Sequence, residues 1–165
     1  MVTYILTVPA GHIAIDDPGS HDVRELLTRH LEFANLHSPP EDVHALDVDA
    51  LRAPTITFFS YRVDGVLLAV GALQQLSADH AELKSMHTGA GARGSGIGRA
   101  MLDHLIRLAR ERGCRRVSLE TGSMDAFAPA RALYAGAGFV SCEPFGDYRS
   151  SRNSTFMTLS LHQEG

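Results

Sequence analysis

The amino-acid sequence predicts an α/β protein in which a mixed, mostly antiparallel sheet carries helices on both faces. Two runs rich in β-formers, TITFFSYRV (55–63) and VLLAVGALQQL (66–76), are joined by Asp64-Gly65, a two-residue hairpin signal. Between residues 82 and 122 a strand, a helix and a second strand follow one another, which is typical of a parallel crossover. Apolar residues recur at helical spacing before the hairpin and within this crossover.

The segment before the hairpin predicts a short strand and two helices. Residues 1–9 suit either a strand or an irregular start, and HIAI (12–15) suits a strand. A helix is expected from Asp22 to about residue 36, with Glu25 three residues after Asp22 as in a capping box. The two prolines of HSPPEDVHALDVDAL suit a loop and the start of a second, shorter helix.

The segment after the hairpin continues the meander and then alternates helices with strands. ELKSMHT (82–88) predicts a third antiparallel strand, after the turn-like SADHA, and it leads directly into the glycine-rich loop GAGARGSGIG (89–98). The remaining expected elements are a helix that ends at Gly113, a strand at 115–122, a helix at 126–136, a short strand at 139–142 and a final strand at 155–161.

Composition predicts one domain spanning residues 1–165 in a cytoplasmic protein. The chain has 165 residues and is 44% hydrophobic, which is enough to bury a sizeable core. Its two cysteines lack C-x-x-C spacing, the N-terminus does not resemble a signal peptide, and no apolar run approaches the ~20 residues that span a bilayer. The net charge of -4 argues against nucleic-acid binding. Five arginines between residues 107 and 116 are expected to form a solvated helix end.

The glycine-rich loop predicts an anion site, because backbone N–H groups at a helix N-terminus point at one spot with the positive end of the dipole behind them. The string fits two patterns. From Gly89 it fits G-x-G-x-x-G, the pattern of a dinucleotide-binding turn, and Glu120 lies roughly where a ribose-binding acid belongs. From Arg93 it fits R-x-x-G-x-G, the pattern of a loop that holds the pyrophosphate of coenzyme A. An antiparallel meander before the loop, and only about 40 residues after residue 122, oppose the dinucleotide pattern.

The run ELKSMHTGAGARGSGIGRAMLDHLIRLARERGCRRVSLETG, followed by ARALYAGAGF, resembles the GNAT superfamily of N-acetyltransferases. With HSPPEDVHALD and EPFGDY it is similar to a bacterial branch of that superfamily. The resemblance implies the GNAT fold, in which two central parallel strands are splayed, and direct acetyl transfer from acetyl-CoA to a primary amine. We expect the acceptor to be a small metabolite, and a homodimer is common in the family.

The resemblance also implies which residues hold acetyl-CoA. The loop would bind the pyrophosphate through backbone N–H groups, and the end of the preceding strand would pair with the pantetheine arm and the acetyl carbonyl. The expected cofactor-binding residues are Met86, His87, Thr88, Arg93, Gly94, Ser95, Gly96, Ile97, Gly98 and Arg99. Phe127 occupies a position where many family members have an asparagine that contacts pantetheine, so that contact is not expected.

Three residues are catalytic candidates: Tyr134 and Glu82 by the same resemblance, and Glu120 by its place in the strand at 115–121. Tyr134 matches the tyrosine that protonates the coenzyme sulfur, although it also suits a packed aromatic position. Glu82 matches a general base for the amine, and it equally suits a strand-end carboxylate paired with Lys84 or an arginine. Glu120 is the rival base, and its alternatives are an anchor for the substrate amine and a structural ion pair.

The acceptor pocket is expected to involve His37, His44 and Tyr148, with Arg149 and Ser151 similarly placed. No metal is expected, because the nine histidines form no H-x-x-x-H or H-E-x-x-H pair. Two other functions stay open: a non-catalytic acyl-CoA sensor on the same fold, and a dinucleotide-binding oxidoreductase.

Overall fold

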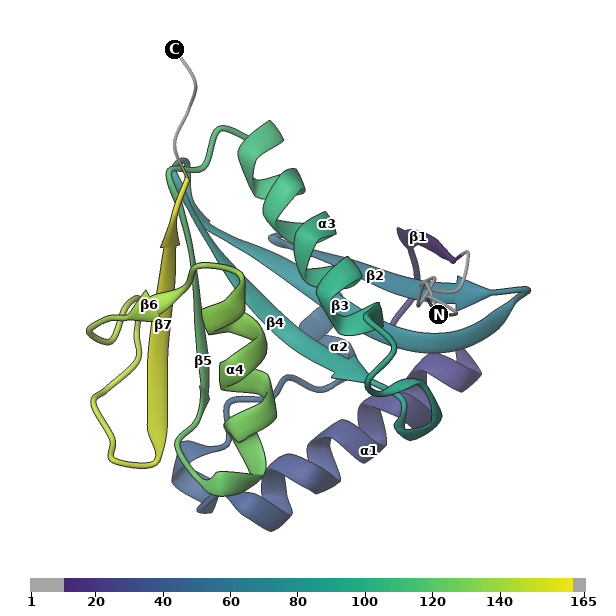
Figure 1. The fold of residues 1–165 in the computed structure, drawn as a ribbon, viewed down its shortest axis with the longest axis horizontal. Helices are drawn as coiled ribbons and strands as arrows, with labels where there is room; N and C mark the ends of the chain where they lie inside the picture. Colours follow the sequence, from purple (N-terminus) through teal and green to yellow (C-terminus); the bar gives the residue numbers. More distant parts are fainter. Residues whose placement is uncertain (1–10, 162–165) are drawn as a thin grey trace, which may run out of the picture.

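Seven strands form one mixed sheet in the computed structural model, which describes residues 11–161 (Figure 1). Their order is β1-β2-β3-β4-β5-β7-β6, and only the central β4–β5 pair is parallel. The predicted mixed, mostly antiparallel sheet is therefore confirmed, whereas the possible strand at 1–9 lies outside the described residues. The strands are β1 (His12–Ile15), β2 (Ile56–Val63), β3 (Val66–Ser77), β4 (His80–Thr88), β5 (Arg116–Gly122), β6 (Val140–Ser141) and β7 (Ser154–Ser160).

Helices cover both faces of this sheet, as the sequence predicts (Figure 1). One face carries α1 and α2, and the other carries α3 and α4. The predicted helix at 126–136 is divided into a 3₁₀ turn and α4. The helices are α1 (His21–His37), α2 (Val48–Leu51), α3 (Ile97–Glu111) and α4 (Ala128–Gly136), and the 3₁₀ turns are η1 (Pro40–Asp42), η2 (Ala90–Ala92) and η3 (Asp125–Phe127).

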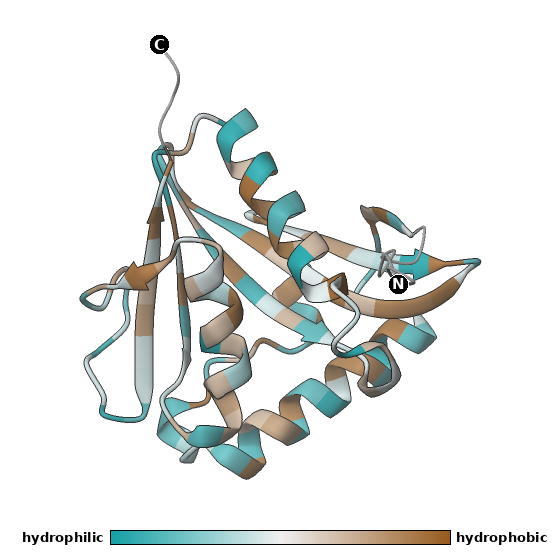
Figure 2. Cartoon of the chain, viewed as in Figure 1, coloured by the Kyte–Doolittle hydropathy of each residue, from teal (hydrophilic) through white to brown (hydrophobic). Residues whose placement is uncertain are grey.

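The two faces of the sheet bury two separate hydrophobic clusters. Phe58 packs with α1 and α2, and its neighbour Phe59 packs with α3, because successive side chains of a strand point to opposite faces. Helix α3 buries a stripe that includes Met101 and Leu105, which are both completely inaccessible. Figure 2 shows the resulting alternation of hydrophobic and hydrophilic residues along α3.

The β2–β3 hairpin forms at Asp64-Gly65, as predicted. Both residues have positive φ, 50° and 78°, which is the geometry of the type I′ turn that matches the twist of two paired strands.

The predicted capping box of α1 is wrong. The N-cap is Ser20, whose side chain makes no capping hydrogen bond. Asp22 instead accepts hydrogen bonds from the Arg62 guanidinium at 2.5 and 3.0 Å, and Glu25 pairs with His21 at 3.3 Å. The Asp22 carboxylate, which the local pattern assigned to the cap, therefore pairs with the Arg62 guanidinium of the neighbouring β2.

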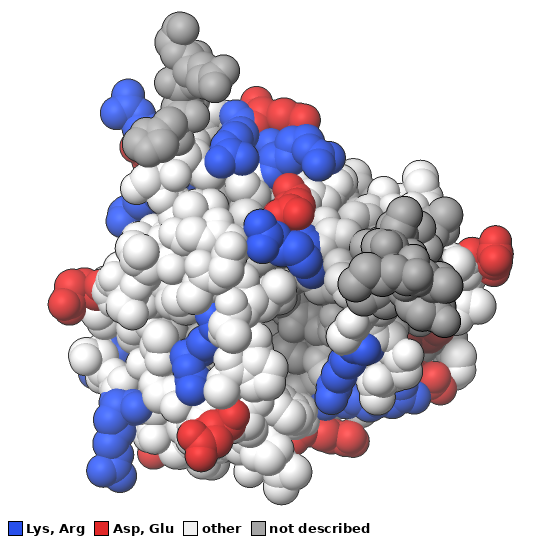
Figure 3. All heavy atoms as spheres, in the orientation of Figure 1, with Lys and Arg blue, Asp and Glu red and all other residues white. Residues whose placement is uncertain are grey.

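The five arginines at and after the end of α3 are all exposed, as expected for a solvated helix end. On the face that Figure 3 shows, basic and acidic side chains are mixed.

The parallel ladder between β4 and β5 is short. It consists of three residue pairs, which join His80–Glu82 to Arg116–Ser118, and the two strands separate beyond them. β4 begins two residues before the predicted start, where His80 Nε2 lies 2.7 Å from Ser118 Oγ. The splayed parallel pair that the resemblance implies is therefore present.

Candidate functional site

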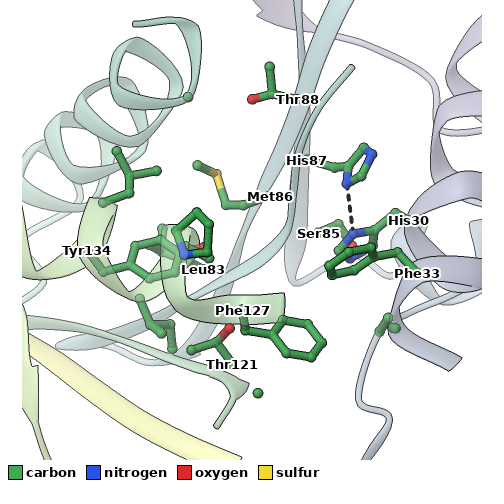
Figure 4. A pocket seen from close by; sticks show the side chains of 18 of the residues that line it. His30, Phe33, Leu83, Ser85, Met86, His87, Thr88, Thr121, Phe127 and Tyr134 are labelled. Atoms are coloured by element: carbon green, nitrogen blue, oxygen red, sulfur yellow. Dashed lines mark hydrogen bonds between the residues drawn. The ribbon is translucent and has the colours of Figure 1, made fainter. Parts of the chain in front are cut away.

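A cavity of about 530 Å³ opens where β4 and β5 separate (Figure 4). Its walls are the ends of these two strands, the glycine-rich loop with the first turn of α3, one side of α1, the segment after η1, and α4. In a mixed α/β sheet, such a gap between strands is a usual place for a ligand.

A β-bulge in β4 shapes the cavity. The pairing of β4 with β3 shifts register between Val70 and Ala72, so that Ser85 and Met86 both lie opposite Gly71. Ser85 has φ of 52°, and its buried hydroxyl lacks a hydrogen-bond partner among the described residues. A Cβ on Gly71 would lie 2.8 Å from Met101 Cγ and 2.9 Å from Met86 Sδ, so a larger residue there would require these two side chains to move. Because a bulge bends its strand, it directs the end of β4 away from β5. The isolated glycine inside the β3 pattern is the sequence signal for this bulge.

The loop after β4 has the geometry of the R-x-x-G-x-G pattern. Gly96, the first glycine of that pattern, has φ of 82°, a conformation that favours glycine, and it is the N-cap of α3. Gly94, which belongs to the dinucleotide pattern, also has a positive φ, of 77°. Gly91, which belongs only to the dinucleotide pattern, has no positive φ and open space around it. Gly96 and Gly98 line the cavity, so the first turn of α3, with its unbonded N–H groups, faces it.

Nine of the ten predicted cofactor residues line the cavity. The exception is Ser95, whose hydroxyl donates to the Ala92 carbonyl and so holds the loop in its turn. Arg93 Nε donates to the Thr88 carbonyl at 3.4 Å, and Arg99 pairs with Asp103 at 2.9 Å. The lining residues are Met86, His87, Thr88, Arg93, Gly94, Gly96, Ile97, Gly98 and Arg99.

Tyr134 lies on α4 and lines the cavity (Figure 4). Its side chain is only 7% exposed, packs edge-on against Phe139, and makes no hydrogen bond to any residue that the structure describes. Burial raises the pKa of its phenol to about 12, and the nearby Glu120 carboxylate adds to this effect. The phenol therefore keeps its proton at neutral pH.

Glu120 lies on β5 and also lines the cavity. Burial raises its pKa from 4.5 to about 7, and the Glu82 carboxylate adds to this effect while the Lys84 ammonium opposes it. A carboxylate with this pKa exchanges its proton near neutral pH, as a general base must.

Glu82 is nearby, but it does not line the cavity. Its carboxylate is 3% exposed, accepts a 2.5 Å hydrogen bond from the Tyr148 hydroxyl, and lies 2.9 Å from Lys84 Nζ. Lys84 Nζ also donates to the Tyr148 hydroxyl at 2.6 Å. The expected pairing with Lys84 is present, and Tyr148, whose ring lines the cavity, completes the network.

The acceptor candidates are divided between the cavity and its surroundings. His44 lines the cavity, its ring meets that of Tyr148 edge-on at 5.0 Å, and burial lowers its pKa. His37 lies outside the lining and packs against Phe127. Arg149 and Ser151 are not among the lining residues.

Among the lining residues that sequence reasoning missed are His30, Phe33, Asp42 and Ser85. His30 and Phe33 project from α1, and the spacing of His30, Phe33 and His37 along one helical stripe is the signal that identifies this face. His30 Nδ1 lies 3.2 Å from His87 Nδ1 (Figure 4), and burial lowers the pKa of both rings to about 4.

Within residues 11–161, no group of three or more His, Cys, Asp or Glu side chains is arranged to hold a metal ion. The helices of this part of the chain are also too short or too polar to cross a membrane.

Comparisons with known proteins agree with this geometry. Residues 20–139 match the sequence model of the Acetyltransferase (GNAT) family. The chain is 47% identical over 150 residues to the uncharacterized N-acetyltransferase YsnE of Bacillus subtilis, covering 91% of this chain and 99% of that protein. Its fold is similar to that of a Klebsiella pneumoniae protein assigned as an acyl-CoA N-acyltransferase, with a TM-score of 0.80, 24% identity and coverage of 93% and 99%. It is also similar to that of a GNAT family acetyltransferase from Elizabethkingia anophelis with acetyl-CoA bound, with a TM-score of 0.67, 15% identity and coverage of 92% and 98%.

Proposed function

Because the chain belongs to the acetyltransferase (GNAT) family, we propose that it transfers an acetyl group directly from acetyl-CoA to a primary amine of a small metabolite. The chain is an acetyl-CoA-dependent N-acetyltransferase, and the proposal concerns its acceptor and the roles of its residues. One observation carries it: a single cavity runs from the glycine-rich loop to Glu120 and Tyr134.

The loop end of the cavity suits the pyrophosphate of acetyl-CoA. The first turn of α3 supplies unbonded N–H groups and the positive end of the helix dipole, and Arg93 adds a cation. The pantetheine arm would lie along Met86, His87 and Thr88, where β4 has left β5. Its thioester would then reach the part of the cavity that holds Glu120 and Tyr134.

Transfer requires that one bond forms and another breaks. The nitrogen lone pair of the amine attacks the thioester carbonyl carbon, and the carbon–sulfur bond breaks as the amide forms. Glu120 accepts the proton that the amine nitrogen loses, and Tyr134 donates its phenolic proton to the departing thiolate. The raised pKa values of both groups support these roles, because Glu120 accepts a proton near pH 7 and Tyr134 holds one to donate.

Glu82 is assigned a positioning role instead. Its carboxylate does not line the cavity, and Lys84 and Tyr148 both hold its Oε2, so it is not placed to meet an amine there. It fixes the two side chains that form the floor of the cavity next to Glu120.

The test combines binding with turnover. Thermal unfolding is measured with acetyl-CoA, free CoA and NADPH, since a ligand at roughly 100 times its dissociation constant stabilises the folded state by about 2.7 kcal/mol. We expect stabilisation by the two CoA compounds alone, and release of free thiol when amines are added with acetyl-CoA. Stabilisation by NADPH alone would refute the assignment of the loop. CoA binding without thiol release for any amine would instead indicate an acyl-CoA sensor.

A further inference from the structure

The end of the cavity far from the glycine-rich loop has a distinct composition. We refer to it as the acceptor end, and it is lined by His30, Phe33, Asp42, His44, Glu120, Phe127 and Tyr148. The chemistry of these side chains is the evidence for the acceptor.

Charge is unbalanced at the acceptor end. Three cationic side chains line the described part of the cavity, and two of them, Arg93 and Arg99, belong to the loop end. The third, Lys84, is held at 2.9 Å by the Glu82 carboxylate and at 2.6 Å by the Tyr148 hydroxyl. The two histidines there add no positive charge at neutral pH, since burial lowers the pKa of His30 to about 4 and also lowers that of His44.

The two carboxylates at this end, those of Asp42 and Glu120, have no ion-pair partner among the described residues comparable to the one that Lys84 has in Glu82. Asp42 Oδ2 accepts a neutral hydrogen bond from Asn153 Nδ2 at 3.0 Å and has no ion pair among the described residues. Glu120 likewise has no cation within ion-pair distance in the described chain, and with a pKa of about 7 it carries part of a negative charge at neutral pH. The acceptor end therefore attracts a positively charged group. Among the described residues, it offers no unpaired cationic side chain that could bind the carboxylate of a substrate.

Part of its wall is apolar and aromatic. The rings of Phe33, from α1, and Phe127, from η3, meet edge-on with centroids 5.3 Å apart. Figure 4 labels both residues among the side chains that line the cavity. Phe127 lies directly on Gly122 of β5, where a Cβ would come within 2.3 Å of its ring, so the backbone of β5 is adapted to the phenyl group. Such a wall suits a planar, apolar group.

We infer that the acceptor is a cationic primary amine borne on an aromatic or bulky apolar body and lacking a carboxylate. This inference rests on the proposed function, because it identifies the substrate class of the same site. The amino group points to Glu120, and the body lies against Phe33 and Phe127.

The first experiment compares 2-phenylethylamine with phenylalanine, which adds a carboxylate, and with putrescine, which lacks the aromatic body. Thiol release from acetyl-CoA gives kcat/KM for each. We expect 2-phenylethylamine to exceed phenylalanine by roughly 100-fold, because like charges repel, and putrescine by about tenfold, because part of the wall is apolar and aromatic. Equal or faster transfer to phenylalanine or putrescine would overturn the inference.

Binding separates this inference from the proposed function. Calorimetry measures the same three amines with the protein loaded with CoA, so the preference is visible even if none is acetylated. The expected order of affinity with no thiol release would refute the proposed function and support the substrate class. Equal affinities would refute the substrate class, whatever the turnover.

Two variants with matched controls locate the preference. Phe33→Ala should raise KM for 2-phenylethylamine by about tenfold and leave KM for acetyl-CoA unchanged, whereas Phe33→Leu, which keeps the apolar bulk, should lose much less. Asp42→Asn should reduce the discrimination against phenylalanine, and Glu41→Gln, at the exposed neighbour outside the cavity, should not. Unchanged selectivity in both Phe33→Ala and Asp42→Asn would overturn the inference.

Discussion

Replacing Glu120 with glutamine should stabilise the folded protein above pH 7 and remove its activity. Burial raises the pKa of this carboxyl group from 4.5 to about 7. The folded chain therefore keeps a proton that the unfolded chain has already lost, and the free energy of unfolding of the native protein falls as pH rises between these values. A pKa difference of this size corresponds to about 3 kcal/mol.

The variant becomes the more stable protein as pH rises because the glutamine side chain does not titrate, so its free energy of unfolding does not fall with the ionisation of residue 120. At about pH 4, where the carboxyl group is protonated in both states, Glu120→Gln and the native protein should be similarly stable. The difference should grow through the window from 4.5 to 7 and stay at its full value of about 3 kcal/mol above it. Over the same range, kcat/KM of the native enzyme should rise as Glu120 becomes able to accept a proton.

Urea unfolding of both proteins from about pH 4 to about pH 8 measures this difference directly. Glu111→Gln, at the exposed end of α3, is the matched control and should show a much smaller pH-dependent difference. A Glu120→Gln variant that is less stable than the native protein by the same amount at every pH would refute the reasoning. Glu120 would then be an ionised partner in a structural pair.

Three further predictions concern the loop, the acid and the buried network. Gly96→Asp should abolish CoA binding with the fold retained, because it places a negative charge against the pyrophosphate at a residue with φ of 82°. The control Gly91→Ala, which adds a Cβ in open space, should bind CoA normally in the same calorimetric titration. Tyr134→Phe should lower kcat and leave CoA affinity nearly intact, and an equal loss of both would indicate a packing role. Lys84→Met should destabilise the protein by about 3 kcal/mol in urea unfolding, because it leaves the buried Glu82 charge without its cation, and adding Glu82→Gln should recover most of that loss.

Much of the fold could be predicted because local patterns and tertiary structure agree. The hairpin at Asp64-Gly65 is set by two residues that tolerate positive φ, and α3 is set by its apolar stripe. The N-terminus of α1 could not be predicted in the same way, because Arg62, 40 residues away, decides where the Asp22 carboxylate lies. Local patterns contain no information about such a partner.

The candidate site was predicted unevenly for a related reason. The loop residues are contiguous in the sequence, and nine of the ten line the cavity. The different positions of Glu82 and Glu120 relative to the cavity could not be predicted in this way. They depend on which side of each strand faces the gap. They also depend on the hydrogen bond that Tyr148, more than sixty residues from Glu82, donates to the Glu82 carboxylate. His30 and Phe33 were missed because a histidine and a phenylalanine on a helix are consistent with an ordinary packed face.

Because the ladder between β4 and β5 is short, little strand pairing joins the two halves of the sheet. Three residue pairs join the two halves, and the hydrogen-bonded chain from His80 through Ser118 to Thr158 lies at that junction. The six residues of β4 beyond the ladder extend about 20 Å, so a rotation of about 3° at the junction moves the far end by about 1 Å. Ser118 belongs to this junction and does not line the cavity, so a substitution there would act on the arrangement of the two strands and not on the reacting groups directly.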